Sequence, residues 1–381
     1  MGIMEIVLPA VVSFILTAAA GKLLIPALVR LKAGQSIKEI GPTWHMTKQG
    51  TPTMGGLMFI VGIGLTIVAL GWRRMMAGEF AHLYVYLFAL VFGLIGCIDD
   101  YQKVKHHHNT GLTALQKFVL QLAAAVAFLC LMRYEGMLSP NLYIPFWNTH
   151  LVLPWPVYLI FAAFVIVGTV NAVNITDGLD GLSSSVTLPV AVFFAVLAVV
   201  WPGFAQLGTF AAAMAGGLCG FLLYNHYPAR VFMGDTGSLF LGGAVAALAF
   251  AYDMPLVLLL VGMAFLSWRR HGDARQLPGS AVRGHRLRLL VANLAGALTY
   301  VPFLVAVALI GRGYVSQLLA AISGLATGSV TLPPLTDNLY LVGIAFLVLL
   351  CPLLPLKALI PAAFAQALPS KKATQTEAAE A

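Results

Sequence analysis

Carboxylate, amide and lysine side chains gather in four short polar motifs of a chain that is otherwise strongly apolar. The motifs read KQGTPTMGG from residue 48, GCIDDYQK from residue 96, NAVNITDGLDGLSS from residue 171 and YNHYPARVFMGDTGSLFLGG from residue 224. Carboxylates combined with lysines favour Mg²⁺ and a polyanionic substrate, because a metal ion offsets charge on a transferring phosphoryl group. The motifs therefore indicate phosphoryl-transfer chemistry.

The pair Asp99 and Asp100 stands at the end of an apolar run. Two adjacent carboxylates at a membrane surface are costly, because like charges repel and burial disfavours both of them. A solvated helix end is the structural interpretation. The functional interpretations are a cation-assisted site and a general base.

The third motif supplies Asn174, Asp177 and Asp180. If the motif continues as a helical turn, these three side chains share one face. The glycines at 178 and 181 permit close approach of a ligand or of a neighbouring helix. The motif is a poor structural cap, so we interpret it as part of a binding site.

The fourth motif, just before an apolar run, offers Asn225, Phe232, Asp235, Thr236 and Ser238. Backbone N–H groups at a helix N-terminus favour phosphate, and a carboxylate with waters can hold Mg²⁺. Asp235 is therefore the candidate metal ligand, although simple helix capping would also explain an acid at this position. The first motif, with Lys48 and Thr53, suits a nucleotide or phosphate but is weak evidence alone.

Long apolar segments must position these motifs. Of 381 residues, 60% are hydrophobic and 9% are charged, whereas about 25% are charged in ordinary soluble domains. Apolar runs of roughly 17 to 25 residues suffice to cross a bilayer as helices, which pair their own backbone groups. We expect an all-α polytopic transmembrane bundle of ten or eleven spans, near residues 4–29, 54–72, 81–98, 116–133, 154–170, 184–201, 207–224, 237–251, 254–267, 289–311 and 340–363.

The charged loops predict how the bundle is oriented. Lysines and arginines concentrate in loops 30–53, 99–115 and 268–288, which by the positive-inside rule are cytoplasmic. The N-terminus then lies outside, its apolar run is a first span and no signal peptide, and all four motifs face the cytoplasm. Arg73–Arg74, on an outer loop, goes against this pattern.

The net charge of +8 is explained by topology and anionic lipid rather than by nucleic acid. The four cysteines lie in apolar runs without metal-binding or disulfide spacing.

The sequence GPTWHMTKQGTPTMGGLMF and the three later motifs resemble the phospho-N-acetylmuramoyl-pentapeptide transferase family over residues 20–265, in that family's order. The resemblance implies a bacterial inner-membrane enzyme. In that reaction undecaprenyl phosphate attacks UDP-MurNAc-pentapeptide, and lipid I and UMP are formed with Mg²⁺ as cofactor. Dimers occur in the family, so a homodimer is allowed, but the oligomeric state stays open.

Roles for individual residues follow only from this resemblance. Asp99 corresponds to the base for the lipid phosphate or to its polar setting, Asp100 lies beside it, and Asp235 coordinates Mg²⁺. A second group lines the nucleotide and diphosphate site, with Phe232 stacked on uracil and the last two lysines contacting phosphate: Lys48, Thr53, Asn174, Asp177, Asp180, Asn225, Phe232, Lys103 and Lys117. Direct attack is favoured over a covalent aspartyl intermediate, because a phosphate oxyanion is already a nucleophile.

The chain departs from the family after residue 266. The family's histidine-rich motif is missing from SWRRHGDARQLPGSAVRGHRLRLL, where His271 and His285 are the histidines present, and His106–His108 lie in another loop. We therefore divide the chain into one membrane transferase domain, 1–368, divergent from 266, and a disordered polar tail, 369–381. The alternatives are a sibling transferase that uses a UDP-N-acetylhexosamine and a catalytically silent membrane scaffold. A transporter is disfavoured because its ionisable residues would lie near mid-bilayer.

Overall fold

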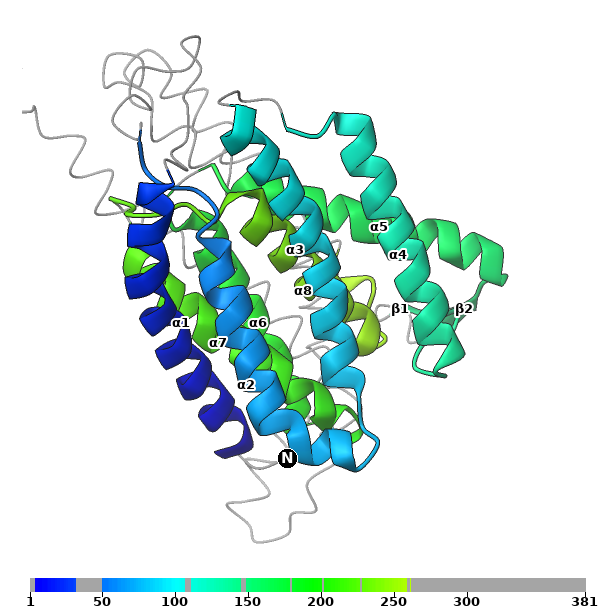
Figure 1. Cartoon of the computed structure of the whole chain (residues 1–381). Helices are drawn as coiled ribbons and strands as arrows, with labels where there is room; N and C mark the ends of the chain where they lie inside the picture. The colour runs from blue at the N-terminus through cyan, green and yellow to red at the C-terminus, as the bar shows by residue number, and fades with distance from the viewer. Residues whose placement is uncertain are drawn as a thin grey trace, which may run out of the picture.

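A bundle of long helices makes up the protein (Figure 1). The structure, a computed structural model, describes residues 4–31, 50–106, 111–144, 149–178, 180–200, 202–226, 228–258 and 261. Within these ranges the helices are α1 (Met4–Arg30), α2 (Gly56–Met76), α3 (Ala81–His106), α4 (Ala114–Tyr134), α5 (Trp155–Thr176), α6 (Leu182–Val200), α7 (Ala205–Asn225) and α8 (Gly234–Ala251). All eight are long and apolar enough to cross a membrane. The prediction of an all-α polytopic membrane bundle is confirmed.

Helix α8 lies at the centre of the bundle and places the fourth motif against the second. Every residue of α8 from Thr236 to Ala251 is buried, and α3 packs along its length (Figure 1). Close approach depends on glycine: a Cβ on Gly96 of α3 would collide with the backbone carbonyl of Asp235, and one on Gly237 would meet Gly56 of α2. The ends of α2, α3 and α8 are therefore held close to one another.

Helices α3 and α5 extend furthest beyond the membrane spans that hydropathy predicts. Helix α3 continues to His106 instead of ending near residue 98, and α5 continues to Thr176 instead of residue 170. Hydropathy marks the apolar part of a helix, whereas the backbone stays helical for as long as its polar side chains find partners. Asp99, Lys103 and Asn174 therefore project from rigid helices, and not from the loops that the sequence predicted.

A short β-hairpin, which the sequence analysis did not predict, joins α4 to α5. Strand β1 (Asn141–Ile144) pairs antiparallel with β2 (Thr149–Val152), with Asn141 opposite Val152. Leu142 of β1 is buried, whereas Leu151 and Val152 of β2 are exposed. The hairpin lies at the end of the bundle away from the polar motifs (Figure 1), so it does not contribute to the site.

The arginine pair that goes against the positive-inside pattern is partly neutralised. Arg74 lies near the end of α2, where its guanidinium donates to Glu79 at 3.0 Å and lies 3.9 Å from Glu5. Local pairing lowers the net positive charge that this end of the bundle presents. The positive-inside rule counts lysines and arginines and not net charge, so Arg73–Arg74 remains an exception to it.

Several sequence predictions lie outside the described residues. These are the spans at 289–311 and 340–363, most of the span at 254–267, the arginine-rich loop and the tail 369–381. The helix count beyond α8 and the division at residue 266 therefore stay predictions.

Candidate active site

Four helix ends meet around the carboxylate of Asp235, which stands in the first turn of α8. Oδ2 of Asp235 accepts from Nζ of Lys103 on α3 at 2.8 Å and from Nζ of Lys117 on α4 at 2.7 Å. Oδ1 accepts from Nδ2 of Asn174 on α5 at 2.7 Å. One carboxylate thus receives donors from three other helices, which fixes it at the centre of the site.

Asp99 is the second carboxylate of this cluster, and its side chain is almost fully buried. Nζ of Lys103, one turn later on α3, lies 2.5 Å from its Oδ2, and Nζ of Lys117 lies 3.2 Å from its Oδ1. The backbone N–H of Leu112, in the segment before α4, also donates to Oδ1 at 2.8 Å. Asp99 and Asp235 therefore share both lysines.

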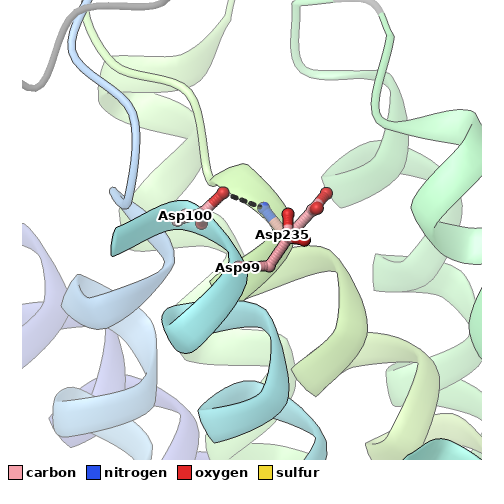
Figure 2. A group of neighbouring side chains, drawn as sticks. All are labelled: Asp99, Asp100 and Asp235. Atoms are coloured by element: carbon pink, nitrogen blue, oxygen red, sulfur yellow. Dashed lines mark hydrogen bonds between the residues drawn. The ribbon is translucent and has the colours of Figure 1, made fainter. Parts of the chain in front are cut away.

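Asp100 has a different role from its neighbour, because it caps the N-terminus of α8. Its Oδ1 accepts from the backbone N–H of Asp235 at 3.1 Å (Figure 2). Its Oδ2 accepts from the N–H and the hydroxyl of Thr236 at 2.8 Å and 2.7 Å. A carboxylate also interacts favourably with the positive end of the helix dipole. The expectation that these N–H groups bind phosphate is wrong for this structure, since Asp100 occupies them.

The turn that brings Asp100 to α8 requires glycine at position 234. Gly234 has φ of +70°, and a Cβ there would lie 2.7 Å from the hydroxyl oxygen of Thr53 and closer still to Asp100. L-residues rarely adopt this conformation, and no side chain would fit. Thr53, a predicted substrate-binding residue, is thereby placed at the edge of the cluster.

The charges and burial of the cluster suit a divalent cation. Asp99, Asp100 and Asp235 each offer one carboxylate oxygen, and these oxygens lie within 4.8 Å of one another (Figure 2). Carboxylate oxygens are the ligands that Mg²⁺ prefers. The cluster holds one more carboxylate than lysine, and Asp99 and Asp100 are almost completely buried. The residues present therefore fit Mg²⁺, with Asp235 and Asp99 as the stronger candidates because Asp100 is committed to capping.

Two loops beside the cluster are joined by Asn225 and Asp180. The side chain of Asn225 accepts from Gly181 N–H at 3.1 Å and donates to the Val231 carbonyl at 2.9 Å. Asp180 accepts from the N–H of Ala229 at 3.0 Å. These bonds fix the third motif against the fourth, so both predicted residues hold the loops in place.

The shared helical face predicted for Asn174, Asp177 and Asp180 is wrong. Helix α5 ends at Thr176, Asp177 is its C-cap, and α6 begins only at Leu182. The side chain of Asn174 bonds to Asp235 while that of Asp180 bonds to the loop at Ala229. Gly178 follows the C-cap, and Gly181 has φ of +71° just before α6 begins.

Of the remaining predicted residues, the structure describes Phe232 but not Lys48 or most of the histidines. Phe232 is partly buried, and its backbone bonds to Pro52 and Gly55, which ties the fourth motif to the first. Lys48, His271 and His285 lie outside the described residues, as do His107 and His108. The substitute for the histidine motif therefore stays an open prediction.

The sequence singled out two hydroxyls of the fourth motif, Thr236 and Ser238, but gave them no partners. Ser238 accepts from Asn174 at 2.8 Å and itself donates to the Gly234 carbonyl at 3.0 Å, while Thr236 bonds to Asp100. Both stand within one turn of Asp235 in the GDTGS string, and this closeness in sequence was the signal that could have indicated their place in the site. Their partners come from helices distant in sequence, which spacing alone does not reveal.

Comparison with protein families gives two matches. Residues 82–253 match the model of glycosyl transferase family 4, and residues 48–60 match signature 1 of phospho-N-acetylmuramoyl-pentapeptide transferases. The first range contains the whole Asp99–Lys103–Lys117–Asn174–Asp235 cluster, and the second contains the start of α2.

Individual relatives carry the same name. A phospho-N-acetylmuramoyl-pentapeptide transferase of Clostridium acetobutylicum is 43% identical over 259 residues, which cover 68% of this chain and 79% of the relative. Relatives with this name from Thermoanaerobacter sp. and Staphylococcus carnosus are 43% and 41% identical, and the matches cover 69% and 68% of this chain and 80% of each relative. The similarity thus extends over most of each relative.

Proposed function

The chain belongs to the phospho-N-acetylmuramoyl-pentapeptide transferase family, and from this premise we propose that it transfers phospho-MurNAc-pentapeptide from UDP-MurNAc-pentapeptide to undecaprenyl phosphate. The products are lipid I and UMP, as in peptidoglycan biosynthesis. The observation that carries the proposal is the convergence of four helix ends on Asp235, where two lysines and two further carboxylates meet. Such a cluster suits two phosphate-bearing substrates.

The lysines supply positive charge for the substrate phosphates. Lys103 and Lys117 are partly exposed, with 32% and 20% of their side chains accessible, whereas Asp99 beside them is buried. An ammonium at the rim of a buried acidic cluster can contact an incoming phosphate while the carboxylates keep it in place. We assign both lysines to binding and charge relief during the transfer.

Asp235 is the proposed Mg²⁺ ligand, with Asp99 beside it. The ion would act as a Lewis acid that offsets charge on the diphosphate. Asn174 orients the Asp235 carboxylate through Oδ1, and Asp100 fixes the first turn of α8 from which Asp235 projects. We assign Asp99 to accept a proton from, or to orient, the lipid phosphate.

Direct displacement accounts for the transfer with few demands on the protein. An oxygen of undecaprenyl phosphate forms a bond to the β-phosphorus of the donor, the bond from that phosphorus to the bridging oxygen breaks, and UMP leaves with the electron pair. Positioning and charge relief suffice, because the attacking phosphate is already anionic. We therefore propose one step without an aspartyl intermediate.

This multi-pass membrane protein carries the cluster at one end of its helices (Figure 1). We place that end in the cytoplasm and the protein in the bacterial inner membrane. The support is the distribution of lysine and arginine among the loops, together with a nucleotide donor that is soluble and a lipid acceptor that is not. The apolar helices keep the acceptor in the bilayer and its phosphate at the surface.

The test is release of UMP and formation of a lipid product by purified, detergent-solubilised protein with undecaprenyl phosphate and Mg²⁺. UDP-MurNAc-pentapeptide and UDP-GlcNAc are supplied in parallel. We expect product from the muramoyl donor alone, with the mass of lipid I. Product from UDP-GlcNAc alone would assign the chain to the sibling branch, and no product from either donor by folded protein would favour the silent scaffold.

A further inference from the structure

A partly buried amide pair joins α4 to α5 about one turn below the cluster. Nδ2 of Asn171 donates to Oε1 of Gln121 at 2.8 Å and also to the Val167 carbonyl of its own helix at 2.8 Å. Gln121 is fully buried, and its Nε2 has no hydrogen-bond partner in the part of the chain that the structure describes. Asn171 is thus the partner that holds the Gln121 side chain.

The pair is in register with two residues of the cluster. Gln121 stands four residues after Lys117 on α4, and Asn171 stands three residues before Asn174 on α5. Residues at these spacings lie on the same face of a helix. Lys117 and Asn174 both bond to Asp235, one at each carboxylate oxygen. The amide pair therefore fixes how far α4 is shifted along its axis relative to α5. These are the two helices whose side chains bond to the two carboxylate oxygens of Asp235.

Apolar packing does little to set this register in the half of α4 nearest the cluster, because the buried apolar residues of α4, which are Ala125, Phe128, Leu129 and Met132, all lie beyond Gln121. Only 28% of the most apolar stretch of α4 is buried inside the described protein, and α4 packs mainly on α5. Lipid tails are as apolar as leucine side chains, so a helix facing lipid gains little from one rotation or height over another, whereas an interhelical hydrogen bond is specific. The Gln121–Asn171 bond supplies that specificity.

We propose that Gln121 and Asn171 are positioning residues for the transfer, acting through Lys117 and Asn174 on Asp235. The inference rests on the proposed function and deepens it. When the bond is lost, α4 and α5 shift relative to each other, Lys117 and Asn174 no longer converge on Asp235, and turnover falls while donor binding by the neighbouring loops persists. A misplacement of about 1 Å in a site can cost about 100-fold in rate.

The test compares steady-state UMP release by wild type, Gln121→Leu, Asn171→Leu and the exchanged pair Gln121→Asn with Asn171→Gln. The exchanged pair keeps the total side-chain length across the interface. Thr169→Val is the matched control, because the hydroxyl of Thr169 is buried on α5 and donates to Val165 of its own helix. Thermal unfolding of each purified variant reports the folded fraction.

We expect Gln121→Leu to lower kcat per folded molecule about tenfold, with KM for the donor within about twofold. Asn171→Leu is expected to be more damaging, since it leaves the Gln121 amide without its partner. The exchanged pair should recover most of kcat, and Thr169→Val should match wild type. Unchanged kcat in Gln121→Leu, or a melting temperature lowered with kcat per folded molecule intact, would overturn the positioning role. An inactive wild type would instead contradict the proposed function.

Discussion

Lys117 and Asp235, 118 positions apart in the chain, lie 2.7 Å apart between Nζ and Oδ2. The same ammonium lies 3.2 Å from Asp99. A lysine at the start of α4 thus bridges a carboxylate at the polar end of α3 and one at the start of α8. Removal of Lys117 leaves the carboxylates of this cluster with one lysine, which is costly in a low-dielectric setting.

Replacement of Lys117 by methionine should lower kcat for UMP release by about 100-fold, because a charge that relieves the transferring phosphate is lost. Methionine keeps much of the apolar stem. Lys105→Met is the control, since Lys105 is exposed on another face of α3, and its kcat should stay within about twofold of wild type. Equal losses in both variants would indicate a general charge effect and contradict a specific role for Lys117.

Asn in place of Asp100 should lower thermal stability more clearly than it changes the chemistry. The asparagine side chain has one uncharged oxygen, so it cannot accept from the N–H groups of both Asp235 and Thr236 as the carboxylate does. We expect the free energy of unfolding to fall by about 1.5–3 kcal/mol. Thermal unfolding of the detergent-solubilised wild type and variant measures this change, with the fluorescence of a dye that does not react with thiols as the signal. An unchanged melting temperature together with lost activity would assign Asp100 to the chemistry itself.

The contact between α3 and α8 should not tolerate a methyl group at residue 96. In Gly96→Ala the new Cβ would collide with the Asp235 carbonyl, so we expect destabilisation of about 1–3 kcal/mol, as for an overpacked core, and loss of activity. Gly168→Ala is the matched control, because a Cβ at this helical glycine meets no atom within 4 Å. The control should be at least as stable as wild type. Wild-type stability of Gly96→Ala would contradict the close approach.

Cysteine labelling checks the side of the membrane on which the cluster lies. Gly178 and Gly203 are exposed and have open space around them, and they lie at opposite ends of the bundle. We expect a membrane-impermeant maleimide to label Gly203→Cys in intact spheroplasts and Gly178→Cys only after permeabilisation. The unmodified chain corrects for labelling of the native cysteines. The reverse pattern would place the cluster outside the cytoplasm.

Membrane spans could be predicted from the sequence because they rest on local hydropathy, and the members of the site could be predicted because the polar motifs and the family resemblance single them out. The long apolar runs correspond to α1–α8, and Asp99, Lys103, Lys117, Asn174 and Asp235 come together as one cluster. Hydropathy fails at the helix ends, however. It does not reveal that α3 and α5 continue beyond their apolar parts, and this extension is what aims their polar side chains at Asp235.

Pairings between distant residues could not be predicted. Asp99 and Asp100 are adjacent and of one type, yet the first bonds to lysines and the second caps α8. A helix places consecutive side chains about 100° apart, so neighbours in sequence face different partners. Only the packing of α3 on α8 determines which partners Asp99 and Asp100 face. For the same reason the Gln121–Asn171 bond had no signal in spacing alone.

The most direct test of the account is kcat for UMP release from UDP-MurNAc-pentapeptide by wild type and Asp235→Asn, at matched folded concentrations and across a range of Mg²⁺. Asparagine keeps the size of the side chain but removes the charge on which Lys103, Lys117 and the proposed cation depend. We predict that wild type is active, that EDTA abolishes this activity, and that the variant loses at least about 100-fold in kcat while it stays folded. Activity of Asp235→Asn within about threefold of wild type, with the same Mg²⁺ dependence, would contradict a catalytic centre at this cluster.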